Sequence, residues 1–172
     1  VIVNEAIVIT EAVFSDDERY RFRLTKTWDE NKRNAVFIGI NPSDATELVM
    51  DKTVMNLMNH LIELHYGEVE ILNLFAYRAK NQKNLVISDK EQNSINMKCI
   101  DKYLNKADLI IVGWGRNAES KPKYRETISD VKVLLKPYKE KVKCFKDRKG
   151  NINCHLSSGY SSLWSLIEYP YL

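Results

Sequence analysis

The sequence is poor in the residues that mark fibrous, low-complexity and membrane-spanning chains. Only 6 of its 172 residues are glycine and 4 are proline, which excludes collagen-like and low-complexity disordered classes. No apolar run reaches the ~20 residues that a membrane-spanning helix needs. The apolar start, VIVNEAIVI, lacks a basic leader and contains Glu5, so we expect no signal peptide and no membrane association. One domain over residues 1–172 is long enough to bury a substantial core.

Cysteine is too scarce for a disulfide framework or a zinc site. Cys99, Cys144 and Cys154 are an odd number without metal-ligand spacing, so we expect reduced thiols and a cytoplasmic location. His60 and His65 lie five residues apart, about 140° around a helix, and cannot form a metal pair on one helix face. No metal and no cofactor are therefore expected.

Two common catalytic motifs are missing as well. Residues 41–53 contain no Gly-Lys-Ser/Thr, which argues against a phosphate loop of the NTPase type. Cys154 and His155 are adjacent and point apart in an extended segment, so a thiol dyad between them is not expected. The expected site also lacks an obvious carboxylate base other than Asp44 or Asp51.

Charge, in contrast, is present and unevenly distributed. The net charge is only +3, but residues 121–149 contain eleven lysines and arginines against four acidic residues. Such an excess is typical of a surface that meets a phosphate backbone, and the alternative is a solvated helix face with its loop. The expected nucleic-acid contacts are Arg116, Lys121, Lys123 and Arg125.

Strand-like and helix-like segments alternate along the chain after an N-terminal hairpin within residues 1–30. Short apolar runs predict strands, and apolar residues at helical spacing predict helices. The expected strands are residues 5–13, 19–26, 35–40, 68–74, 108–114 and about 141–145, and the expected helices are residues 54–65, 89–105, 122–136 and 161–167. Asp51 is the expected N-cap of the first helix, and Gly67 its stop.

This alternation predicts βαβ units and an α/β fold with three layers, α/β/α. We expect a central, mainly parallel sheet of four strands, with the strand at residues 35–40 near its middle and the hairpin as an addition. In open sheets of this kind, ligands bind beyond the carboxyl ends of the strands. The functional residues should therefore follow the strands in the sequence.

Polar and aromatic residues do follow each expected strand. The strand at residues 35–40 runs into Asn41-Pro42-Ser43, and the delay before the next helix indicates a site loop. Each such residue, taken alone, also has an ordinary explanation as a turn, core or loop residue. The others that follow strands are Asn73, Phe75, Arg78, Trp114, Arg116, Asn117, His155, Ser157 and Ser158. Their convergence at one edge of the sheet predicts a single site.

These motifs closely resemble the domain of unknown function 1643 family, found in bacteria and phages, over most of residues 20–157. The resemblance rests on INPSDAT, DKT, NLFAYRAKNQKNL and VGWG. One departure is that the family usually carries Gly-x-Pro-x-His-Pro-Leu where this chain has Gly150-Asn-Ile-Asn-Cys-His-Leu, so the histidine is displaced by one residue. The matching positions are Asn41, Pro42, Ser43, Ala45, Asp51, Thr53, Asn73, Leu74, Phe75, Ala76, Arg78, Leu85, Trp114, Gly115 and Gly150.

The same outline is more distantly similar to the uracil-DNA glycosylase superfamily. Gly39-Ile40-Asn41-Pro42 matches its Gly-x-Asn-Pro turn, and Leu72-Asn73 matches its strand that ends in a base-reading asparagine. His155-Leu156-Ser157-Ser158 matches its last loop weakly. The resemblance implies a glycosidase-like activity that removes a base, such as a modified base, from a nucleic acid or nucleotide.

Base removal requires a water over the sugar, hydrogen-bond donors for the departing base and a ring on which the base stacks. We expect Asn41 to hold the water, Asn73 to read the base and His155 to stabilise the leaving anion. Phe75 or Tyr77 would stack the base. The other substrate-binding candidates are Pro42, Ser43, Asp51, Arg78, Trp114 and Ser157.

Two further functions stay open at this point. A non-catalytic module that binds nucleic acid or nucleotides needs the basic face but no open pocket beside Asn41. An enzyme that acts on a modified nucleoside or nucleotide needs the pocket. The state of the Asn41 pocket is the feature that discriminates among them.

Overall fold

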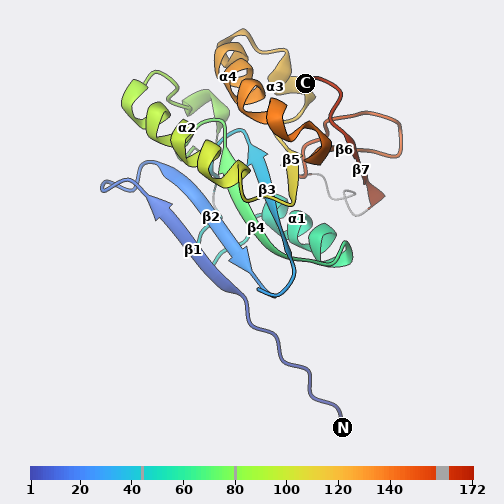
Figure 1. Cartoon of the computed structure of the whole chain (residues 1–172). Helices are drawn as coiled ribbons and strands as arrows, with labels where there is room; N and C mark the ends of the chain where they lie inside the picture. Colours follow the sequence, from blue (N-terminus) through green and yellow to red (C-terminus); the bar gives the residue numbers. More distant parts are fainter. Residues whose placement is uncertain (44, 80, 158–162) are drawn as a thin grey trace.

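The computed structural model describes residues 1–43, 45–79, 81–157 and 163–172. Within them one mixed sheet has seven strands in the order β1-β2-β4-β3-β5-β6-β7 (Figure 1). The middle strands β4, β3, β5 and β6 are mutually parallel, and the outer strands β1, β2 and β7 pair antiparallel. The strands are β1 (Ile9–Phe14), β2 (Arg21–Thr27), β3 (Arg33–Gly39), β4 (Tyr66–Asn73), β5 (Leu109–Val112), β6 (Val142–Lys146) and β7 (Ser165–Glu168).

The chain is thus an α/β protein, as predicted, but the prediction of a four-stranded sheet is wrong. The hairpin of β1 and β2 joins the sheet because β2 pairs with β4 from Leu24 opposite Ile71 to Thr27 opposite Glu68. β7 adds a further strand beside β6. The strand β3 nevertheless lies at the centre, with β4 on one side and β5 on the other, as expected.

Helices cover both faces of this sheet (Figure 1). Apolar residues of α1 pack on one face with Phe37 and Ile71, whereas those of α2 and α4 pack on the other face with Val36 and Ile38. The alternation of β3 side chains between the two faces explains why its run of apolar residues is continuous. The helices are α1 (Lys52–Glu63), α2 (Lys90–Leu104), α3 (Arg116–Glu119) and α4 (Arg125–Leu135), with short 3-10 segments η1 (Gln82–Asn84), η2 (Pro122–Tyr124) and η3 (Lys136–Lys141).

The start of α1 is set by Asp51, as predicted. Its carboxylate accepts a hydrogen bond from the Val54 backbone N–H at 2.8 Å, which satisfies a donor that the first helical turn leaves unpaired. The helix ends before Gly67, because His65 takes a left-handed conformation with φ of 60°. Gly67 instead lies in β4, where a Cβ would come within 1.8 Å of the Asp29 carbonyl oxygen.

The prediction of a helix at residues 161–167 is wrong over the part that the structure describes. Residues Ser165–Glu168 form β7, and its backbone pairs with Lys143–Lys146 of β6. Four residues of local pattern cannot distinguish a helical turn from an edge strand, whereas the open edge of β6 offers unpaired backbone groups. The partner strand therefore determines the conformation.

Glu119 connects α3 to the core and to the C-terminal segment. Its carboxylate accepts hydrogen bonds from the Trp114 Nε1–H at 2.7 Å, the Lys132 ammonium at 2.9 Å and the Tyr169 hydroxyl. Burial acts to raise the pKa of Glu119, but these hydrogen bonds outweigh it, so the pKa lies below its ordinary value. Removal of the carboxylate would leave three donors unsatisfied in a largely buried place.

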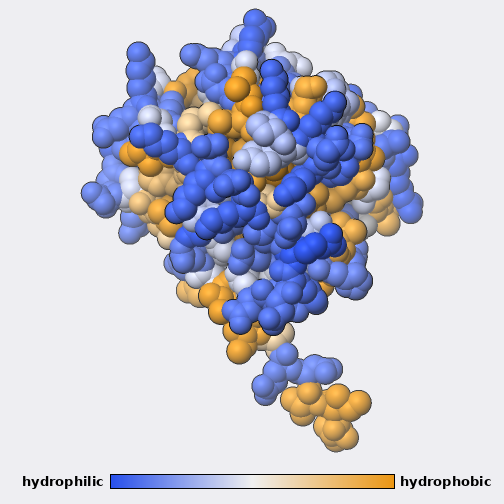
Figure 2. Space-filling view, viewed as in Figure 1, coloured by the Kyte–Doolittle hydropathy of each residue, from blue (hydrophilic) through white to orange (hydrophobic). Residues whose placement is uncertain are grey.

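The view in Figure 2 shows a predominantly hydrophilic body with an apolar end on the N-terminal segment. Residues 1–8 have no regular structure, and Val1, Ile2 and Ile7 are exposed. Among the described residues no helix is both long and apolar enough to cross a lipid bilayer.

We predict that Glu119→Ala lowers the free energy of unfolding by about 3 kcal/mol, because it leaves the donors of Trp114, Lys132 and Tyr169 without their acceptor. Urea unfolding followed by tryptophan fluorescence measures the change. Glu140→Ala is the matched control, since Glu140 is exposed, and should change stability by no more than about 0.5 kcal/mol. Equal stability of both variants would contradict the role of this carboxylate.

Candidate functional site

Two adjacent cavities lie beyond the carboxyl ends of the parallel strands, where the α/β topology predicts a site. The first, of about 360 Å³, opens between the ends of β2, β3 and β4 and the N-terminus of α1; we call it the amide cavity, because Asn41 and Asn73 line it. The second, of about 500 Å³, lies on the α3 side; we call it the basic cavity, because Arg116 and Lys121 line it. Ile40, His155 and Ser157 line both cavities.

Asn41 is held in place by its own amide group. Its Nδ2 donates to the carbonyl oxygens of Pro42 at 2.9 Å and Ala79 at 2.8 Å, which joins the turn after β3 to the segment after β4. Both amide hydrogens are therefore engaged, and Oδ1 is the polar atom that remains to meet a ligand. The fixed φ of Pro42 restricts the same turn.

Asn73 lies beside Gly39 on the same face of the sheet, since the two are register partners in β4 and β3. A Cβ on Gly39 would come within 2.7 Å of Asn73 Oδ1, so the missing side chain of the glycine makes room for the amide. Asn73 is only 4% exposed, and its Nδ2 has no hydrogen-bond partner among the described residues. An unpaired buried donor at a cavity wall is costly unless a ligand or water accepts from it.

Ser43 and Asp51 form the wall next to the first turn of α1. The Ser43 hydroxyl donates to one oxygen of the Asp51 carboxylate, and the other oxygen caps the helix. Lys52 and Thr53 of this first turn also line the amide cavity. Asp51 is thus an orienting group with both oxygens engaged, while the Ser43 oxygen can still accept a hydrogen bond.

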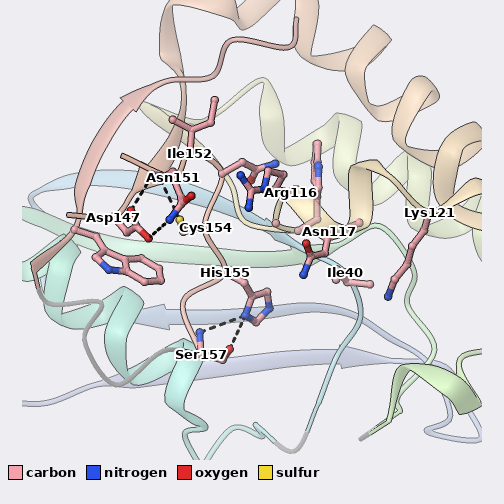
Figure 3. Close-up of a pocket in the computed structure, with 15 residues that line it drawn as sticks. Ile40, Arg116, Asn117, Lys121, Asp147, Asn151, Ile152, Cys154, His155 and Ser157 are labelled. Atoms are coloured by element: carbon pink, nitrogen blue, oxygen red, sulfur yellow. Dashed lines mark hydrogen bonds between the residues drawn. The ribbon is translucent and has the colours of Figure 1, made fainter. Parts of the chain in front are cut away.

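His155 separates the two cavities. Its Nδ1 accepts a hydrogen bond from the Ser157 backbone N–H at 3.2 Å and lies 3.0 Å from the Ser157 hydroxyl (Figure 3). Acceptance at Nδ1 places the proton of the neutral ring on Nε2. Burial lowers the pKa of His155 below its ordinary value, and the nearby Asp51 carboxylate acts in the opposite direction. At neutral pH the ring is therefore an uncharged hydrogen-bond donor.

Arg21 lines the amide cavity and is only 2% exposed. Its Nη1 donates to the Ala45 carbonyl oxygen, and its Nε has no partner among the described residues. Sequence analysis missed this residue, because Arg21 belongs to the hairpin and local pattern gave no signal that the hairpin would dock against β4.

Phe37 is a second residue of the amide cavity that sequence analysis missed. Its ring packs over Gly113, where a Cβ would come within 2.1 Å of the ring, and lies close to Gly39 as well. The two glycines at the ends of β3 and β5 are the signal that could have indicated a bulky ring between them. Phe37 thus supplies an aromatic wall beside Asn73.

The basic cavity has a different set of walls. His155 lies between Arg116 and Asn117 on one side and the turn of Asp147 and Asn151 on the other (Figure 3). Gly115 has a φ of 81°, and a Cβ there would come within 3.4 Å of the His155 Cβ, so the backbone of α3 approaches the histidine closely. Arg116 is exposed, and Lys121 lies with its ammonium 5.4 Å from the centre of the Tyr124 ring.

The structure brings some of the predicted site residues together and places others elsewhere. Asn41, Ser43, Asp51, Asn73, His155 and Ser157 line the amide cavity, and Arg116, Lys121 and Trp114 line the basic cavity. Pro42 is buried in the turn that contains Asn41. Ser158 and Asp44 lie outside the described residues.

The aromatic side chains among the predicted substrate-binding residues make contacts within the fold. Phe75 is 1% exposed and packs on Tyr124 at 5.2 Å between ring centres. Trp114 is also 1% exposed, with its indole N–H bound to Glu119. Tyr77 packs edge-on against Tyr20. Phe75 and Trp114 are thus too deeply buried to stack a base, and Tyr77 is half-buried and lines neither cavity.

Several basic residues are likewise engaged in the fold. Arg78 donates to the Glu18 carbonyl oxygen at 3.1 Å and lies over the Phe14 ring, away from both cavities. Lys123 and Arg125 are exposed on η2 and α4 without lining either cavity. Within residues 121–149, Lys132 and Lys143 pair with carboxylates and Lys141 donates to a carbonyl oxygen. Part of the basic segment is therefore engaged within the fold.

Comparison with known families identifies the family of this chain. The family described as "protein of unknown function (DUF1643)" matches residues 21–155, and the chain belongs to this family. The match begins at Arg21 and ends at His155, so it includes every described residue that lines the amide cavity except Ser157. No curated protein and no solved structure matches the chain.

We predict that His155→Gln flattens the pH dependence of stability in mildly acidic solution. A histidine whose folded pKa lies below the unfolded value of about 6.5 binds its proton more readily in the unfolded state, so stability falls as the pH drops below about 6.5. Urea unfolding at a series of pH values from about 7.5 to about 5 measures the slope. The other two histidines are common to both proteins; an unchanged slope would show that His155 is not buried as a neutral ring.

Proposed function

We propose that the amide cavity holds a nucleobase and that its walls hydrolyse the N-glycosidic bond between this base and its sugar, in a nucleic acid or a nucleotide. The observation that supports the proposal most directly is the buried Asn73 amide: the residue lines the cavity, and its Nδ2 has no hydrogen-bond partner among the described residues. Asn73 shares that cavity with the acceptor of Asn41 and the imidazole of His155. Recognition of the base, positioning of the water and stabilisation of the leaving group thus each have a candidate residue.

Asn73 would recognise the base. A carboxamide offers a donor and an acceptor side by side, which matches the hydrogen-bonding edge of a nucleobase. Phe37, rather than Phe75 or Tyr77, would supply the aromatic contact, because its ring lines the cavity. A cavity of about 360 Å³ is within the range of small-molecule sites.

Asn41 and Ser43 would hold the attacking water. The Asn41 Oδ1 and the Ser43 oxygen each accept a hydrogen bond, so a water that donates to them directs its lone pair at the sugar carbon. The Ser43 hydroxyl donates to Asp51, so the proton that the water loses can pass to the Ser43 oxygen while the Ser43 proton passes to the Asp51 carboxylate. The new C–O bond forms at the sugar as the C–N bond breaks.

His155 would stabilise the departing base. The electron pair of the broken C–N bond leaves with the base, and a neutral imidazole with its proton on Nε2 can donate a hydrogen bond to the resulting anion. The depressed pKa of His155 keeps the ring neutral, so the ring is a donor without being a strong acid. Arg116 and Lys121 in the adjoining cavity would meet phosphates of the same substrate.

We predict that Asn41→Ala lowers the rate of base release about 100-fold with little loss of binding, because the water loses its acceptor. The measurement is single-turnover kinetics on the oligonucleotide or nucleotide that scores in a panel of modified bases, read as free base and abasic product. Asn93→Ala is the matched control. The Asn93 amide also donates to a backbone carbonyl oxygen, that of Ile87 at 2.8 Å, and lies outside the amide cavity.

The outcomes of this pair of variants separate the competing functions. Loss of activity in Asn41→Ala alone supports catalysis at the amide cavity. Equal loss in both variants would assign Asn41 a structural role only. Full activity of a folded Asn41→Ala, or a panel in which no base is released while binding persists, favours the non-catalytic binding module.

We predict that Asn73→Ala weakens discrimination among bases by about 1–3 kcal/mol, the value of a lost buried hydrogen-bonded pair. Discrimination is the ratio of kcat/KM for the preferred base to that for the next best base in the panel. Because the Asn73 Nδ2 has no hydrogen-bond partner among the described residues, removal of the amide should cost little stability. An unchanged ratio would exclude Asn73 from base recognition.

A further inference from the structure

Arg21 is a buried cation for which the described residues supply no counter-ion. Among the described residues no carboxylate oxygen lies within the ion-pair distance of 4.0 Å of its guanidinium. Its one hydrogen bond, from Nη1 to the Ala45 carbonyl oxygen, uses a small part of five N–H donors. A charged group that is 2% exposed and unpaired costs several kcal/mol of desolvation, which is rarely left uncompensated.

The guanidinium nevertheless stays charged. Burial lowers the pKa of Arg21 to about 10, and the carboxylates of Asp51 and Glu47 act to raise it. At neutral pH the cavity therefore has a positive wall. The side chain is planar and bears parallel donors, a geometry that matches the oxygens of a phosphate.

The opposite wall of the amide cavity is also suited to an anion. The first turn of α1, with Lys52 and Thr53, lines the cavity, and its backbone N–H groups and dipole attract negative charge. The one carboxylate in this lining, that of Asp51, has both oxygens occupied by Ser43 and Val54. The described lining thus has two cations, Arg21 and Lys52, against one engaged anion.

We propose that Arg21 and the first turn of α1 form a phosphate subsite of the amide cavity. This subsite deepens the proposed function and rests on it for the base, because it makes the substrate a phosphate-bearing nucleotide unit rather than a free nucleoside. The phosphate group itself can belong to a mononucleotide or to a nucleic-acid backbone. The two sources present the same oxygens to the same donors.

The chain offers a close control for a purely structural role of Arg21. Lys26 lies on the same strand, is 3% exposed and also donates to carbonyl oxygens of the loop after β3, at 2.8 Å to Glu47 and 3.4 Å to Thr46. Lys26 does not line the amide cavity. Both residues hold the loop, but only Arg21 is placed to meet a ligand.

The test measures the midpoint of thermal unfolding of the full chain against the concentration of inorganic phosphate, with ionic strength held constant by chloride. A ligand that binds the folded state raises this midpoint in a saturable manner. We expect saturable stabilisation of the wild type and of Lys26→Gln, and an apparent affinity about tenfold weaker or undetectable in Arg21→Gln. General salt effects act on all variants alike, so they cancel when each variant is compared with the wild type.

Three results would overturn the subsite. They are an unsaturable wild-type response, an unchanged affinity in Arg21→Gln, and an equal loss in Lys26→Gln, which would mean that Arg21 acts only through the loop. If Arg21→Gln does not fold, Lys52→Gln decides instead, because Lys52 is exposed and its substitution leaves the core intact. Weaker phosphate binding by this variant supports the subsite, and unchanged binding refutes it.

The source of the phosphate is distinguished by two further probes. Nucleoside 5′-monophosphates are compared with the matching nucleosides, and a single-stranded oligonucleotide with hydroxyl ends is compared in wild type and Arg21→Gln. Dependence on Arg21 for the monophosphates indicates a mononucleotide, and dependence for the oligonucleotide alone indicates a backbone phosphate. Dependence for neither contradicts the subsite. Since none of these readings requires base release, a failed glycosidase assay leaves the phosphate result intact, and the reverse also holds.

Discussion

The site depends on the parallel register that sets Gly39 of β3 beside Asn73 of β4. Parallel neighbours end at the same edge of a sheet, so this pairing delivers Asn41 and the Asn73 amide to one cavity. The register extends past the strands, because the backbone N–H groups of Leu74 and Phe75 donate to the carbonyl oxygens of Gly39 and Ile40. A shift by one residue would turn Asn73 to the other face of the sheet. The register of β3 and β4 therefore determines which side chains meet in the cavity.

The parts of the fold that local pattern encodes could be predicted from the sequence. The central strand β3, the helix α1 and the Asp51 cap follow from an apolar run, a helical spacing and a residue type that favours the N-cap. The location of Asn41, Asn73 and His155 around one cavity was also predictable, since strand ends converge in any parallel sheet. These inferences required only the order of elements.

The rest depended on contacts between distant segments. Whether β2 would pair with β4, and so bury Arg21 in the site, is decided across more than forty residues of intervening chain. Phe75 and Trp114 were predicted at the site because both follow strands. Instead, both rings are buried in the core that packs against α2 and α4. The position of a residue after a strand predicts the edge of the sheet at which it lies. It does not predict on which face of the sheet its side chain is buried.

Hydrogen bonds from several parts of the fold hold the loop after β3 without any ligand. Asn41 joins it to Ala79, Ser43 joins it to Asp51, and the buried side chains of Arg21 and Lys26 hold the carbonyl oxygens of Ala45 and Glu47. Neutral carbonyl dipoles compensate a buried charge only in part, so holding the loop with two buried cations has a high cost in desolvation free energy. Lys26 engages two carbonyl oxygens with three donors, whereas Arg21 engages one with five. Arg21, on the wall of the cavity, therefore retains more unused N–H donors than Lys26. This difference distinguishes a cation that only supports the loop from one that can also bind a ligand.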